Sequence, residues 1–69
     1  MAKFSVADIA PGQKYEQKGG FTWQVLRLIA FTAERAPHAQ LVNVRDPSTT
    51  KTLSAEVLLD KNRFKRVEA

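Results

Sequence analysis

The last seventeen residues, 53–69, constrain the fold of this chain more than any other feature. A short strand there leads into one tight apolar turn over residues 55–60, and a terminal strand rich in Lys and Arg follows it. Val57, Leu58 and Leu59 give this turn the apolar side chains needed to cover one end of a small core. The segment therefore predicts a β-rich fold and indicates where positive charge gathers.

Glycine and proline divide the rest of the chain into pieces of strand length. The breaks fall at Pro11-Gly12, Gly19-Gly20, Pro37 and Pro47. The glycine pair is the strongest turn signal, because glycine adopts positive φ angles at little cost and suits tight hairpins. Short strands separated by regular turn signals are typical of all-β sandwiches and barrels.

The pattern predicts an all-β fold, a five-stranded antiparallel barrel with one short 3-10 or helical turn before the last strand. We expect the strands at residues 13–18, 21–32, 38–46, 51–54 and 63–67, and the turn at residues 55–60. Ser54 is a candidate cap for that turn, since serine accepts a hydrogen bond from a free backbone N–H. The fifth strand is expected to pair with the first and to close the barrel.

The second strand carries apolar residues in two conflicting registers. Trp23 and Val25 alternate cleanly, whereas Leu26 and Leu28 lie in the opposite phase. A bulge or strong bend near Leu26-Arg27 would bring the two halves into agreement, as long strands of small barrels commonly require. The face that residues 26–32 bury stays open. The predicted core consists of Tyr15, Trp23, Val25, Leu28, Leu41, Val44, Leu53, Val57, Leu58, Phe64 and Val67.

This order of strands and turns resembles the SH3-like small barrel, a fold shared by SH3, Tudor, KOW and Sm-type domains. The resemblance covers about residues 11–67. It rests on Pro11-Gly12 with Tyr15, on the Gly19-Gly20 hairpin before Trp23-Gln-Val25, and on residues 53–67 with their single tight turn. The chain is also similar to short bacterial proteins of unknown function that share its Pro-His-Ala, Lys-Thr-Leu-Ser and Leu-Leu-Asp segments.

The ligands of those domains do not follow from the resemblance. Eukaryotic SH3 domains carry an Ala-Leu-Tyr-Asp-Tyr strand, an acidic loop and a Trp pair, all of which this sequence lacks. No aromatic cage of the Tudor type can be assigned, and KOW elements have more glycines than the three found here. Likeness of fold alone does not define function.

Composition limits the chemistry that the chain can perform. Its 69 residues predict a single domain, residues 1–69, with a marginal core, and the absence of cysteine excludes disulfides and thiolate chemistry. The single histidine, His38, follows Pro37 at a strand start and is expected to have a structural role. No catalytic constellation and no metal or cofactor site is predicted, so we expect a non-enzymatic protein.

Positive charge indicates one class of partner. Eleven Lys and Arg against seven Asp and Glu give a net charge of +4, which favours an anionic partner or serves solubility. If strands one and five pair, their cations could form one outward stripe able to neutralise nucleic-acid phosphates. An exposed Tyr15, Phe21 or Trp23 beside it would stack bases. The candidate nucleic-acid-binding residues are Lys14, Lys18, Lys61, Arg63, Lys65 and Arg66.

A second hypothesis is a protein-interaction or self-assembly module without a nucleic-acid role. It requires an exposed apolar patch, for which Leu26, Phe31 and Val42 are the candidates. The opening residues lack the apolar stretch of a signal peptide, and the longest apolar run is too short to cross a bilayer. We therefore expect a cytoplasmic monomer that does not bind membranes.

Overall fold

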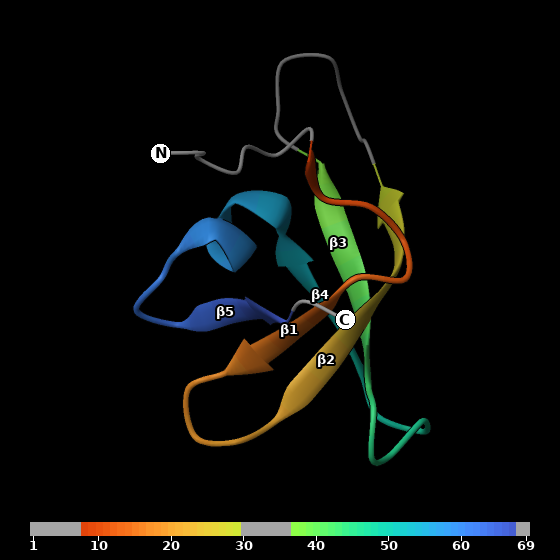
Figure 1. Cartoon of the computed structure of the whole chain (residues 1–69). Helices are drawn as coiled ribbons and strands as arrows, with labels where there is room; N and C mark the ends of the chain where they lie inside the picture. Colours follow the sequence, from red (N-terminus) through yellow and green to blue (C-terminus); the bar gives the residue numbers. More distant parts are fainter. Residues whose placement is uncertain (1–7, 30–36, 68–69) are drawn as a thin grey trace.

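The structure, a computed structural model, describes residues 8–29 and 37–67 and consists of strands with short turns (Figure 1). The strands are β1 (Lys14–Gln17), β2 (Thr22–Ile29), β3 (His38–Asn43), β4 (Thr50–Ser54) and β5 (Phe64–Val67), and a 3-10 helix, η2 (Ala55–Leu59), precedes β5. The predicted all-β class and the short turn before the last strand are confirmed.

All five strands form one antiparallel sheet in the order β4-β3-β2-β1-β5, which curls into a half-barrel (Figure 1). The predicted pairing of the first and last strands is present, with Gln17 opposite Phe64. The hydrogen-bonded sheet does not close into a full barrel, because β4 and β5 are its two edges. The 3-10 helix η2 instead contacts both edge strands and covers the gap between them.

A bulge in β2 resolves its two conflicting registers. The pairing of β2 with β3 shifts between Val25 and Arg27, where the sequence predicts a bulge. The extra residue turns Leu26 outward, with 45% of its surface exposed, and returns Leu28 to the side of the core. The open question of which face is buried is settled this way as far as Ile29, the last described residue of the strand.

The core lies on the concave face of the sheet and is covered by η2. Its buried apolar residues are Ile9, Tyr15, Trp23, Val25, Ala39, Leu41, Ala55, Leu58 and Phe64, and Leu28, Leu53 and Val57 pack partly buried against them. The prediction was wrong for Val44 and Val67, which are 41% and 40% exposed. Side chains alternate along a strand, so Val67 lies on the opposite face of β5 from Phe64, three residues earlier, whereas Val44 follows the last residue of β3, Asn43.

Backbone groups shape the turns at both ends of the sheet. Gly19 and Gly20 have φ angles of 111° and 105°, and the Gly20 N–H donates to the Gln17 carbonyl at 3.0 Å, which confirms the predicted hairpin turn. The predicted cap of η2 is wrong, because the Ser54 side chain makes no capping hydrogen bond. The Ala55 N–H at the start of η2 donates instead to the Pro37 carbonyl at 2.9 Å.

The loop between β3 and β4 is organised by the Asp46 carboxylate. The Ser48 and Thr49 hydroxyls donate to it at 2.6 Å and 2.7 Å, and the Thr49 N–H donates to the Asp46 carbonyl at 2.9 Å. These bonds confirm the turn predicted from Asp46-Pro47. Because hydrogen bonds stabilise the ionised form, the two hydroxyls lower the pKa of Asp46.

This geometry predicts a pH-dependent role for Asp46 in stability. A lowered pKa means that the contribution is present above the pKa of the unfolded chain and is lost as the pH falls through the folded pKa. Asp46→Ala is expected to lower the melting temperature at neutral pH by a few degrees and to converge with the wild type in acid. Thermal unfolding from pH 7 to pH 2 measures this, and a deficit independent of pH would contradict it. Ser48→Ala is the control, because it keeps the carboxylate and removes one of its two hydroxyl donors. Its pH-dependent loss of melting temperature should be smaller than that of Asp46→Ala.

Candidate nucleic-acid interface

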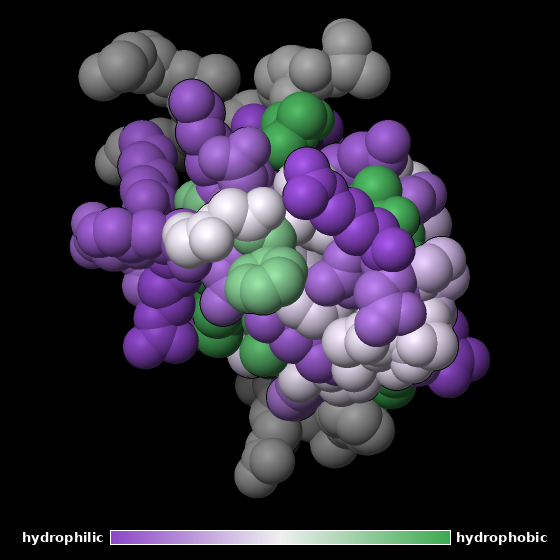
Figure 2. Space-filling model, turned by 90° about the horizontal axis from the view of Figure 1, so that it is seen from below, coloured by the Kyte–Doolittle hydropathy of each residue, from purple (hydrophilic) through white to green (hydrophobic). Residues whose placement is uncertain are grey.

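Most of the Lys and Arg residues predicted to bind nucleic acid lie at one end of the half-barrel. The β1–β2 turn at residues 18–21 shares one hollow there with the turn at residues 61–63 and another with the β3–β4 loop at residues 44–49. We call this end the hairpin end. Figure 2, seen from below Figure 1, shows small patches of apolar surface there among hydrophilic side chains.

A shallow groove on the hairpin end brings together four of the six predicted binding residues. The hairpin groove, as we name it, is lined by residues 16–20 and 61–65, and it contains Lys18, Lys61, Arg63 and Lys65. Among the described residues that line it, Glu16 alone is acidic, and it lies opposite Lys65 in the pairing of β1 with β5. The groove therefore has an excess of positive charge and suits an anionic ligand.

The local structure that positions these cations differs from the predicted one. Lys61 and Arg63 were expected to alternate with Lys65 along an extended strand, but residues 61–63 form a turn before β5 begins. The N–H groups of Arg63 and Phe64 both donate to the Asp60 carbonyl at 2.9 Å. Residues Lys61 and Arg63 thus reach the groove from a turn.

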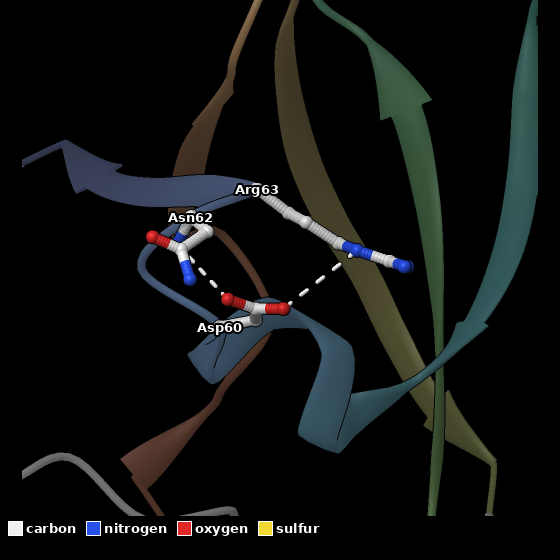
Figure 3. A network of polar contacts seen from close by, with 3 residues as sticks. All are labelled: Asp60, Asn62 and Arg63. Carbon is white, nitrogen blue, oxygen red and sulfur yellow. Dashed lines mark hydrogen bonds and ion pairs between the residues drawn. The ribbon is translucent and has the colours of Figure 1, made fainter.

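The Asp60 side chain holds this turn (Figure 3). Its carboxylate accepts a hydrogen bond from the Asn62 N–H at 2.9 Å, and the Arg63 Nε lies 3.7 Å from its second oxygen. The side chains of Arg63 and Asp60 are 67% and 42% exposed to solvent, so the pair contributes little to stability. Arg63 can therefore exchange Asp60 for another anion at low cost.

Lys14 and Arg66 lie apart from the hairpin groove. Lys14 lies opposite Gln24 and Val67, at the far end of β1 from the β1–β2 turn. Arg66 is half-buried opposite Tyr15, on the other face of β5 from Lys65. Its charge partly offsets the effect of burial, which raises the pKa of the Tyr15 hydroxyl. The expected single stripe is thus a cluster of four cations, with Lys14 further along the same face and Arg66 separate.

Only one of the three candidate stacking residues is accessible. Tyr15 and Trp23 are buried, whereas Phe21 is 59% exposed. Phe21 lines a second hollow beside the β1–β2 turn, the aromatic hollow, together with Arg45 and Thr49. Gln17 and Lys18 line both this hollow and the hairpin groove, so a ligand across the turn would contact the aromatic ring and the cations together.

Sequence reasoning missed Lys51, which points inward from β4. Lys51 lies opposite Leu41, a fully buried residue of the concave face. Its Nζ is 4.1 Å from the centre of the Trp23 ring and donates a hydrogen bond to Gln17 Oε1 at 3.1 Å. The signal that would have found it is the alternation of β4, which puts Lys51 on the same face as Leu53.

The described residues offer little else that is typical of a reactive site. Among residues 8–29 and 37–67, no group of three His, Asp or Glu side chains could hold a metal ion. His38 is half-buried in β3, between Ile29 of β2 and Ser54 of β4. Within the same residues there is no helix with the length and hydrophobicity needed to cross a membrane.

Comparison with known proteins defines no family for this chain, since no family model, curated protein or solved structure matches it. Its class therefore rests on its own architecture. The protein is a small half-barrel of five antiparallel strands with a cationic, partly aromatic end.

Proposed function

We propose that this protein is a non-enzymatic module that binds single-stranded nucleic acid at its hairpin end. The observation that carries the proposal is that exposed Phe21 lines a hollow that shares Lys18 and the β1–β2 turn with the hairpin groove and its four cations. We further propose that the half-barrel belongs to the SH3-like fold and that the protein acts as a cytoplasmic monomer.

The two parts of the hairpin end match the two parts of a nucleic-acid strand. Lysine and arginine neutralise phosphates and release counterions, which makes binding strongly dependent on salt. An exposed aromatic ring stacks on any unpaired base and contributes about 1–3 kcal/mol. A duplex keeps its bases stacked on each other, so Phe21 favours a single strand.

This chemistry predicts that binding depends little on the sequence of the nucleic acid. Stacking and phosphate contacts carry little sequence information, because every base has an aromatic face and every nucleotide a phosphate. We expect labelled single strands of different sequence to bind with similar affinity and to release at moderate salt. An amide NMR titration should show salt-sensitive shifts clustered on residues 16–21 and 61–65.

Substitution of Phe21 separates stacking from simple apolar contact. Phe21→Ala and Phe21→Leu are both expected to weaken the binding of a single strand about tenfold, whereas Phe21→Trp should preserve it. Fluorescence anisotropy with a labelled oligonucleotide measures the affinity, and circular dichroism confirms the fold. If Phe21→Leu bound as tightly as the wild type, the stacking role would be wrong.

The alternative, a protein-interaction module, has weaker support in the structure. Of its three candidate patch residues, Leu26 is exposed, Val42 is half-buried, and Phe31 lies outside the described residues. A titration with nucleic acid that leaves every amide unchanged, together with self-association in sedimentation experiments, would favour this alternative.

A further inference from the structure

Lys51 is held in one place by its surroundings. Its Nζ donates to Gln17 Oε1 at 3.1 Å, and the same oxygen accepts the Trp23 Nε1 hydrogen at 2.9 Å. The ammonium also lies 4.1 Å from the Trp23 ring centre and 5.6 Å from the Phe64 ring centre. Two aromatic faces and an amide oxygen thus fix the position of this cation before any ligand arrives.

The ammonium of Lys51 lacks a negatively charged partner among the described residues. None of their carboxylates forms an ion pair with it, and its contacts are neutral. Partial burial removes water from the charged group and lowers its pKa. An anion placed beside Lys51 would offset this loss of solvation, so the site gains more from an anion than an exposed lysine does.

Lys51 lines a third hollow, the Lys51 pocket, which shares Lys18 and Arg63 with the hairpin end. Two further cations, Lys18 and Arg63, line this pocket of about 390 Å³, and none of its described lining residues is a carboxylate. Leu53 and Val57 also line the pocket, together with the buried Phe64. Because Lys18 also lines the hairpin groove, the pocket and the groove are continuous.

The three cations that line the Lys51 pocket indicate which kind of phosphate group fits it best. A phosphodiester inside a strand carries one negative charge, whereas a terminal phosphate monoester carries nearly two at neutral pH. Three cations around one hollow without a carboxylate among its described lining residues match the monoester better.

We propose that the Lys51 pocket binds the terminal phosphate of a nucleic-acid strand whose adjoining nucleotides occupy the hairpin groove. This inference rests on the proposed function and adds a preference for strand ends. In this arrangement Lys51, Lys18 and Arg63 all donate hydrogen bonds to the phosphate.

The test compares three oligonucleotides of one sequence: unphosphorylated, 5′-phosphorylated and 3′-phosphorylated. Anisotropy competition at fixed salt should show that one phosphorylated end binds about tenfold more tightly than the unphosphorylated strand, as expected for a charge-assisted contact. Lys51→Met keeps the apolar stem over Trp23 and removes the charge, so it should abolish this advantage and leave the unphosphorylated strand bound. Lys14→Met, an exposed lysine at the far end of β1, is the matched control and should retain the advantage.

The outcomes separate this inference from the function on which it rests. Equal binding of all three oligonucleotides, or an advantage that survives in Lys51→Met, would overturn the inference alone. Failure of all three to bind the wild-type protein would overturn the proposed function and the inference together. Circular dichroism of Lys51→Met shows whether the variant is folded. If it is not, Lys51→Arg, which restores the charge with a different geometry, provides the comparison and should retain part of the advantage.

Discussion

Replacement of Lys61, Arg63 and Lys65 together by Glu is expected to abolish binding of single-stranded nucleic acid, by at least about a hundredfold at low salt. Each substitution removes a positive and adds a negative charge, so the net charge falls from +4 to −2. The loss has a local cause as well, since all three side chains line the hairpin groove. Anisotropy as a function of salt measures both the loss and the shallower salt dependence of any residual binding.

The fold should survive this triple substitution, because all three residues are exposed and, of the three, only Arg63 forms an ion pair with another described residue. Single reversals provide a matched control. Arg63→Glu and Arg27→Glu each remove an exposed arginine with one polar partner, Asp60 for Arg63 and Gln40 for Arg27. Both change the net charge equally, so a larger loss for Arg63→Glu assigns the effect to the groove. Equal losses of affinity in the two variants would mean that only the net charge determines binding, and would contradict the assignment of the hairpin groove as the binding site.

Replacement of Leu41 by Ala is expected to destabilise the domain by about 2–5 kcal/mol. Leu41 is among the largest fully buried side chains and lies opposite Val25 in the middle of the sheet. A loss of this size is comparable to the whole stability of a domain of 69 residues. We expect a large fall in the urea midpoint or a protein that is unfolded at room temperature.

Leu26→Ala is the matched control for this prediction. It removes the same atoms from a leucine of the same sheet that is 45% exposed at the bulge, so folding buries much less of its apolar surface than that of Leu41. We expect a change below about 1 kcal/mol. Similar losses for the two variants in urea unfolding would show that the core is not centred on Leu41.

The sequence predicts the strands well because turn residues and alternation are local signals. Glycine and proline mark the ends of the strands, and the conflict between Val25 and Leu28 correctly indicates the bulge. The predicted core was wrong where we assigned a residue to the interior because it is apolar, without following the alternation of the strand. Leu41 and Val44 are three residues apart and cannot share a face without a bulge, and the buried position belongs to Asn43.

Asn43 could not be assigned to the interior from its residue type. Its side-chain oxygen accepts the Arg45 N–H at 2.9 Å, so the polar group is satisfied by the turn that follows. A buried asparagine is acceptable when its hydrogen bonds are made. Such bonds depend on the folded geometry of the loop and are not visible in a pattern of apolar residues.

The candidate site was predicted in part. The positive charge of strand five was evident, and the pairing of β5 with β1 placed Lys65 near Lys18 as expected. The turn at residues 61–63 and the inward position of Lys51 were missed. Both depend on where a strand begins, since a shift of one residue exchanges the inner and outer faces.

The pairing of β1 with β5 also determines how the chain must fold. The contact between Gln17 and Phe64 closes a loop that contains the other three strands, so it forms at a high cost in chain entropy. Local hairpins, such as β1 with β2, need no such closure and can form early. Folding should therefore be slow for a domain of this size, with the docking of β5 as a late step. Until β5 docks, the backbone of β1 is an unpaired edge on which another chain could add a strand.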